Sequence, residues 1–150
     1  MTNHIGFKMI EAEPMSECTF LSEVKGQDVS NREDRHGYKV VYPDGYVSWS
    51  PKDVFEKAYM QVGDNNTITE TNVHDFVKEI EYQPWGDKTT IAKATLTNGF
   101  VMVESSSCVD PENFNMDIGS SICKERIYNR VWHMLGFLLQ SAKYGVKGGK

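Results

Sequence analysis

The sequence predicts an α+β fold, in which antiparallel β-hairpins pack with a long C-terminal helix. Two observations predict the hairpins, because β-rich runs flank a short turn at residues 38–49 (YKVVYPDGYVSW) and at residues 89–105 (TTIAKATLTNGFVMVES). A third observation predicts the helix, since apolar residues recur at helical spacing over residues 117–142. We expect an N-terminal segment of a β-hairpin and a helix over residues 1–62, and a module of a β-hairpin and the long helix over residues 68–142.

Composition limits the classes of function. The 150 residues are 39% hydrophobic and carry a formal net charge of -5, which suits one modest core or two very small ones. An acidic chain is not expected to coat DNA or RNA, because those polymers attract basic surfaces. Three cysteines in unrelated contexts fit a reducing compartment, and no stretch has the length of a membrane span or the pattern of a signal peptide. We therefore expect a cytoplasmic protein without a membrane partner.

The first hairpin leads directly into a helix. Its turn is Pro43-Asp44-Gly45, where proline presets one backbone angle and glycine supplies a positive φ. A helix should then run to about Met60, with Ser50 as its N-cap and Pro51 at its first position. Residues 23–36 are polar and are expected to form a loop.

A linker and a second helix are expected next. Residues 62–67 (VGDNNT) have the composition of a linker. Apolar residues at i, i+3, i+4 and i+7 then predict an amphipathic helix, which Asn72 with Asp75 would cap. These apolar residues are Val73, Phe76, Val77 and Ile80. Residues 83–88 are expected to turn.

The second hairpin and the final helix complete the chain. Asn98-Gly99 predicts a type I′ turn, with residues 100–105 as the returning strand. Residues 110–113 (DPEN) are typical of a single helical turn, and Asn115 is a candidate N-cap for the last helix. The final residues, 143–150, are expected to form a flexible tail.

The last helix carries apolar residues on more than one face. Ile118 and Ile122 point away from the main apolar face, which a kink or a change of partner along the helix would explain. Gly136 is one place at which the helix could bend. The residues of the main face, which should meet the core, are Ile127, Val131, Met134, Leu135, Leu138 and Leu139.

A stripe of basic and aromatic residues lies between these faces. Arg126, Arg130, His133 and Phe137 follow positions i, i+4, i+7 and i+11. The two arginines are like charges one turn apart, so an acidic neighbour in the fold, an acidic partner subunit or a bound anion would offset their repulsion. A guanidinium suits phosphate because its planar fork donates parallel hydrogen bonds. The alternative is that both arginines are solvated or paired with glutamates.

Several residues are of the types that hold a nucleotide. A base stacks on an aromatic ring, amides contact its edges, and arginine binds phosphate. Core packing for the aromatic rings and a turn role for the amide are the alternatives. No motif for metal binding or catalysis occurs in the sequence, and Cys108 is interpreted as structural, so neither a cofactor nor an enzyme activity is expected. The residues of the required types are Phe100, Asn113, Phe114, Arg126 and Arg130.

Two stretches of the sequence resemble known phage proteins. Residues 96–140 carry NGF, a Ser-rich step, CVDPENF and a helix with a central tryptophan, and they resemble a family of small phage and prophage accessory proteins. The front piece, with GYKVVYPDGYVSWSPKDVFEKAY, resembles a leader segment of small phage proteins. The family itself is similar to the first type of Thoeris anti-defence protein.

This resemblance implies a fold, a function and a site. Such proteins are sponges, which bind the cyclic ADP-ribose isomer made by a TIR-domain sensor and sequester it without cleavage, and some also hold cyclic oligonucleotides. The resemblance also implies long kinked helices, self-association into dimers or larger homo-oligomers, and a pocket between subunits. An aromatic ring would stack on adenine, an amide would contact ribose or base, and basic residues would hold the diphosphate. The residues for these roles are Phe100 or Phe114, Asn113, and Lys124, Arg126 and Arg130.

The sequence therefore predicts a phage anti-defence protein that captures a cyclic nucleotide immune signal in the cytoplasm of the infected bacterium. Two other functions remain open. One is an interaction module that docks on a host protein and inhibits it. The other is an enzyme that degrades a nucleotide.

Overall fold

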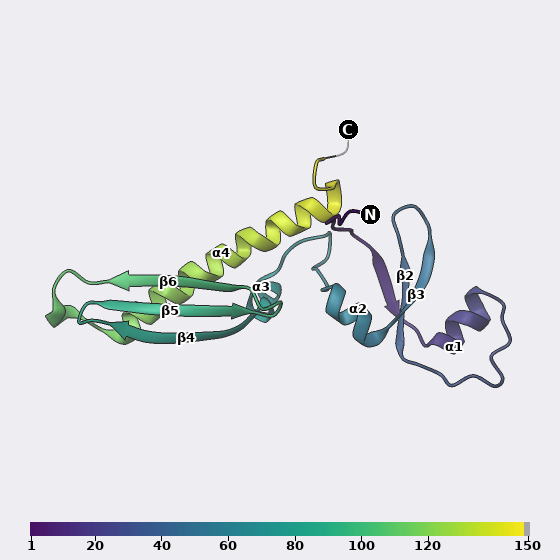
Figure 1. The fold of residues 1–150 in the computed structure, drawn as a ribbon, viewed down its shortest axis with the longest axis horizontal. Coiled ribbons are helices and arrows are strands. Elements are labelled where there is room, and N and C mark those ends of the chain that lie inside the picture. Colours follow the sequence, from purple (N-terminus) through teal and green to yellow (C-terminus); the bar gives the residue numbers. More distant parts are fainter. Residues whose placement is uncertain (149–150) are drawn as a thin grey trace. The chain divides into compact units, whose positions relative to one another are not determined.

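Two three-stranded antiparallel sheets and a long C-terminal helix make up the described chain. The structure is a computed structural model that describes residues 1–148. The predicted α+β class is confirmed (Figure 1). The chain divides into two compact units. Of the described residues, unit 1 contains 1–61 and 141–148, and unit 2 contains 62–140. Of the predicted tail, Gly149 and Lys150 lie outside the described residues.

Unit 1 is built on a sheet with the strand order β1-β2-β3. These strands are β1 (Glu11–Pro14), β2 (Gly37–Val41) and β3 (Val47–Pro51). The predicted β2–β3 hairpin is confirmed, and Gly45 adopts a φ of 85° at its turn. Two short helical elements between β1 and β2 were not predicted, because their segment has no apolar periodicity. They are α1 (Glu17–Thr19) and the π-helix η1 (Phe20–Val24).

The helix after the first hairpin begins later than predicted. It is α2 (Lys52–Ala58), its N-cap is Pro51, and no side chain caps it. The prediction of Ser50 as the N-cap was wrong, because Ser50 extends β3 and pairs with Tyr38 of β2. Tyr38 also stacks on Phe55, with ring centroids 4.1 Å apart, so this contact fixes α2 against the sheet.

The predicted linker is a tight turn rather than an extended connection. Gly63 and Thr67 form an isolated antiparallel bridge, in which the Gly63 amide donates to the Thr67 carbonyl at 2.8 Å. Asn65 and Asn66 adopt φ values of 58° and 56° between them. Asparagine tolerates this left-handed region better than most residues, which explains the pair at this position.

Unit 2 holds a second sheet, with the strand order β4-β5-β6. Its strands are β4 (Val77–Trp85), β5 (Thr89–Leu96) and β6 (Val101–Ser107). The strand predicted at residues 89–96 is confirmed, and so is a returning strand after Gly99. A short helix, α3 (Glu70–Phe76), precedes β4, and Thr69 caps it in a reciprocal capping box with Asn72.

The helix predicted through Ile80 was wrong in its second half. Val77 begins β4, Ile80 pairs with Ala94 of β5, and the strand continues to Trp85, which the sequence placed in a turn. From Ile80 onward apolar and polar residues alternate, as a half-buried strand requires. A helix followed by such a strand reproduces the i, i+3, i+4, i+7 spacing by coincidence, so the pattern predicted too long a helix.

The turn between β5 and β6 is not type I′, which requires positive φ at both central residues. Only Gly99 has a positive φ, of 85°, and its amide donates to the Leu96 carbonyl at 2.9 Å. The Asn98 side chain instead accepts a hydrogen bond from the Phe100 amide at 3.0 Å. This is the three-residue hairpin loop with a left-handed glycine, so the hairpin was predicted correctly but its turn type was not.

The connection from β6 to the last helix follows the prediction. Residues 111–113 form a 3-10 helix, η2 (Pro111–Asn113), with Pro111 at its start. The helix α4 (Met116–Tyr144) then begins at a side-chain cap, because Asn115 Oδ1 accepts hydrogen bonds from the amides of Asp117 and Ile118 at 2.9 and 3.0 Å. Helical hydrogen bonding continues through Gly136, and the kink stays a prediction.

The core of unit 2 lies between α4 and one face of its sheet (Figure 1). Ala92 and Ala94 of β5 are small, which lets the helix approach closely. At Gly119 the helix lies so near the sheet that an added Cβ atom would lie 2.8 Å from Thr90 Cβ. Of the six residues on the predicted core face, three are buried and Met134, Leu138 and Leu139 are half-buried. The buried residues of α4 are Gly119, Cys123, Ile127, Val131 and Leu135 within unit 2, and Ser141 beyond it.

Candidate functional site

The two arginines of the predicted stripe reach from α4 to the edge strand β6. Arg126 Nη1 donates a hydrogen bond to the Ser105 carbonyl. Arg130 Nη1 lies 2.7 Å from Glu104 Oε1 and 3.4 Å from the Val103 carbonyl oxygen. Of the three ways to offset arginine repulsion, the fold itself therefore supplies one, an acidic neighbour. The contacts also cover backbone carbonyls at an edge that would otherwise pair with another strand.

Each guanidinium is held through one nitrogen and keeps other donors unused. A guanidinium has five N–H donors, and those on Nε and Nη2 of both arginines make no hydrogen bond to any residue in the described part of the chain. Both side chains face solvent, and that of Arg130 is 49% exposed. The pair is thus oriented by β6 while its remaining donors stay available to an anion.

Exposed apolar residues occur on both faces of β6. Met102 and Glu104 face α4, so Val101 and Val103, which alternate with them, lie on the opposite face of the sheet. Two strand residues span about the same length as four helix residues, so the contacts of Arg126 and Arg130 set a register between α4 and β6. Extended by the same spacing, that register predicts that Phe137, which is 68% exposed, approaches the beginning of β6 and the 51% exposed Phe100. We call this surface the α4–β6 margin. Its residues are Phe100, Glu104, Arg126, Arg130 and Phe137.

One chain does not bring all the predicted ligand-binding residues together. Phe100 precedes β6, whereas Asn113 and Phe114 follow it, so the length of the strand, roughly 20 Å, separates them. Figure 1 shows the β5–β6 turn and the β6–α4 connection at opposite ends of the sheet. Asn113 is exposed and Phe114 is half-buried. A pocket that used both ends would need a second copy of the chain.

Lys124 lies on the other flank of α4. Two residues along a helix rotate the side chain by about 200°, so Lys124 and Arg126 diverge. The ammonium group of Lys124 lies 5.7 Å from the ring centroid of Tyr128. Tyr128 in turn contacts His74 of α3, with ring centroids 4.4 Å apart. Within one chain, Lys124 therefore does not share an anion with the arginine pair.

Glu104 is the member of this surface that sequence reasoning missed. Its side chain is 19% exposed and holds Arg130 in place. It pairs with Ala92 of β5, which places it on the sheet face that α4 covers. Its position in an otherwise apolar and serine-rich strand was a hint. Its pairing depends on the register between strand and helix, which the linear sequence does not reveal.

The cysteines have structural surroundings. Cys108 is half-buried, and its thiol donates to the Asp110 carbonyl at 3.1 Å. Cys123 is buried between α4 and β5, and burial raises the pKa of its thiol. A high thiol pKa disfavours the thiolate that a nucleophile needs. Among residues 1–148, no group of three or more His, Cys, Asp or Glu side chains could hold a metal ion.

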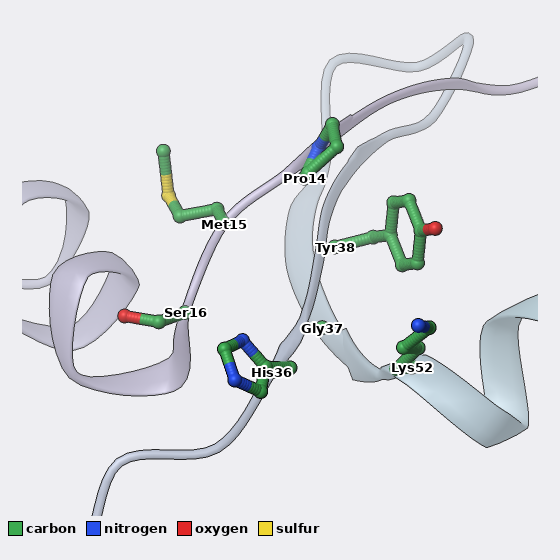
Figure 2. A pocket seen from close by; sticks show the side chains of 7 residues that line it. All are labelled: Pro14, Met15, Ser16, His36, Gly37, Tyr38 and Lys52. Carbon is green, nitrogen blue, oxygen red and sulfur yellow. The ribbon is translucent and has the colours of Figure 1, made fainter.

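A separate hollow lies in unit 1 and contains none of the predicted site residues. It measures about 420 Å³ and lies where β1 and β2 approach the start of α2. In Figure 2, Met15 and Ser16 line one side, with Tyr38 and Lys52 opposite. Two hydrogen bonds hold its wall: the Met15 amide donates to the Gly37 carbonyl at 3.0 Å, and the Trp49 side chain donates from Nε1 to the Met15 carbonyl at 2.8 Å.

None of the helices in the described part of the chain is both long and apolar enough to cross a membrane. No curated protein and no solved structure matches the sequence. The Phage protein (N4 Gp49/phage Sf6 gene 66) family matches residues 68–143, which is half of the chain. The match runs from just before α3 almost to the end of α4, so it includes the sheet of unit 2 and the α4–β6 margin. The chain belongs to this family of phage proteins.

Proposed function

We propose that the protein binds a cyclic nucleotide immune signal of the infected bacterium and sequesters it without cleaving it. The expected signal is a cyclic ADP-ribose isomer made by a TIR-domain protein, with cyclic oligonucleotides as further ligands. The protein would act in the host cytoplasm and so block an immune effector. The family match supports a phage origin, and the resemblance to sponge proteins suggests the ligand.

The observation that carries the proposal is the pair of oriented guanidiniums. Arg126 and Arg130 are one helical turn apart, a separation of about 5–6 Å between their Cβ atoms. Two adjacent phosphates of a diphosphate suit that spacing, because each guanidinium can donate to one of them. Phe100 lies on the same margin and offers an exposed ring for base stacking. The local positive charge outweighs the net charge of -5 because salt screens the more distant carboxylates.

A second copy of the chain would complete the pocket. The margin is exposed along one side, and Asn113, Phe114 and Lys124 of the same chain lie away from it. In a homodimer these residues can come from the partner, as in the interface pockets that the resemblance implies. Self-association is thus part of the proposal.

Sequestration works by mass action. A protein in excess over the signal, with a dissociation constant below the threshold concentration of the effector, keeps the unbound signal below that threshold. Neither a catalytic group nor a cofactor is required. This is consistent with the structural surroundings of Cys108 and Cys123.

Thermal unfolding of the full chain with a panel of cyclic ADP-ribose isomers and cyclic dinucleotides tests the proposal. We expect at least one ligand to raise the midpoint of unfolding in proportion to the logarithm of its concentration. Arg130→Ala should weaken binding of that ligand by about 1.5–3 kcal/mol, the scale of a charged hydrogen bond. Lys78→Ala, on β4, is the control, because it removes the same charge from the opposite edge of the sheet.

Binding that both variants retain unchanged would place the ligand elsewhere. No stabilisation by any member of the panel would refute sequestration of such signals.

A second function is favoured by the apolar part of the margin. Phe100 and Phe137 are both exposed, and Val101 and Val103 are exposed on the other face of β6. Exposed apolar residues that gather on one surface are typical of protein-binding sites. A module that docks on a host protein and inhibits it would use this surface without a nucleotide. The same ligand panel separates the two functions, because a docking module gains no stability from nucleotides.

A further inference from the structure

We propose that Glu104 sets the affinity of the α4–β6 margin, because it both orients Arg130 and competes with a ligand diphosphate for it. This inference rests on the arginine pair of the proposed function and names a residue that the function itself does not require. Glu104 would be a positioning residue that keeps binding weaker than the two arginines alone would allow.

The contact geometry supports the orienting role. Glu104 Oε1 lies 2.7 Å from Arg130 Nη1, and the Glu104 side chain is only 19% exposed. A largely covered carboxylate on a strand has few alternative positions, so it fixes the end of the longer arginine side chain. The second contact of the same nitrogen, to the Val103 carbonyl at 3.4 Å, is too long to do this alone.

The charges support the competing role. Arg126 is held by a neutral carbonyl, whereas Arg130 is held by a carboxylate. The three side chains together carry one net positive charge instead of two. A diphosphate that bridges the arginines is drawn by both guanidiniums and repelled by Glu104 at short range.

The ligand class follows from this arrangement. An anion that engages only Arg130 gains little, because it meets a guanidinium whose charge Glu104 already balances. An anion with two adjacent phosphates can bind Arg126 fully and share Arg130 with Glu104. The margin is therefore suited to a diphosphate rather than to a single phosphate.

Calorimetric titration of the full chain with inorganic pyrophosphate at low ionic strength tests the inference. Glu104→Gln keeps an oxygen that can accept from Arg130 but removes the charge. We expect it to bind pyrophosphate about threefold to tenfold more tightly than the unchanged protein, because the substitution removes a Coulomb repulsion over about 6 Å that salt partly screens. Raising the salt concentration should shrink the difference.

Glu81→Gln is the matched control. Glu81 also lies on the sheet and is ion-paired, with Lys93 at 2.8 Å, but it belongs to β4, at the edge opposite β6. The Glu81→Gln substitution removes one negative charge from the same unit, and its side chain contacts neither arginine. Its pyrophosphate affinity should stay within about twofold of the unchanged protein.

A double-mutant cycle separates competition at Arg130 from a general charge effect. In an Arg130→Ala background, Glu104→Gln should change the affinity by less than in the unchanged protein, because the shared partner is gone. An equal effect in both backgrounds would overturn the inference. So would unchanged or weaker pyrophosphate binding by Glu104→Gln, or no measurable pyrophosphate binding by either protein.

This inference and the proposed function fail in different ways. Tighter pyrophosphate binding by Glu104→Gln, together with no binding of any cyclic nucleotide, would support the role of Glu104 and refute the proposed ligand. Binding of a cyclic ADP-ribose isomer with an affinity that Glu104→Gln leaves unchanged would support the proposed ligand and refute the role of Glu104.

Discussion

Gly119 and Gly136 occupy the same helix but have different surroundings. A Cβ atom added at Gly119 would lie 2.8 Å from Thr90 Cβ, closer than side-chain atoms pack. A Cβ atom at Gly136 would meet nothing within 4 Å. The first glycine therefore permits contact between α4 and β5, while the second only adds backbone freedom to the unfolded chain.

The substitution Gly119→Ala should lower the free energy of unfolding by about 1–3 kcal/mol, the cost of forcing an extra group into a packed contact. Gly136→Ala should raise it by about 0.5–1 kcal/mol, because alanine favours the helix. Urea unfolding followed by circular dichroism measures both. A neutral Gly119→Ala would show that α4 does not pack on Thr90 as described, and a destabilising Gly136→Ala would point to a bend there.

Residue types in the candidate site were predicted better than residue partners. Helical spacing was enough to place Arg126 and Arg130 on one stripe, since it depends only on the period of the helix. The sequence could not show that Glu104 meets Arg130, because that contact depends on how α4 lies against β6. Lys124 was grouped with the arginines through the family resemblance, and the turn of the helix places it on the other flank.

The caps and turns determine where the elements begin. Asn115 accepts hydrogen bonds from two amides at the start of α4, which otherwise have no partner inside the helix. Asn113, two residues earlier, is exposed, and its side chain makes no hydrogen bond among the described residues. The two asparagines thus differ in role although they are close in sequence.

Asn115→Ala should lower the free energy of unfolding by about 1 kcal/mol through loss of the N-cap. Asn113→Ala should change it by less than about 0.5 kcal/mol, because it removes an exposed side chain. Thermal unfolding of both variants in the absence of ligand checks the difference. Equal losses would mean that the Asn115 side chain does not cap α4 in solution.

Elements with local signals were predicted, and those that depend on distant pairing were not. The β2–β3 hairpin, β5 and the start of α4 are each marked by turn or cap residues within a few positions. The boundary between α3 and β4 is different, because Val77 and Ile80 fit both a helical spacing and a strand. Pairing of β4 with β5 decides between them, and a linear pattern does not contain that information.

For the molecule as a whole, the family match covers most of unit 2 but not residues 1–61 of unit 1. The family match begins at residue 68 and includes the sheet of unit 2, with the arginine pair at one edge. Residues 1–61 lie outside the match and carry their own sheet and hollow. The sponge proposal concerns unit 2, so ligand capture should depend on the α4–β6 margin.

The fate of the bound ligand tests sequestration most directly. The full chain is incubated with a cyclic ADP-ribose isomer, separated from unbound ligand by gel filtration, and denatured by heat. We predict that intact ligand co-elutes with the protein, is released on heating, and is lost from the protein fraction of Arg130→Ala. Recovery of a cleaved product, or of a protein fraction without any ligand, would contradict sequestration of the intact signal.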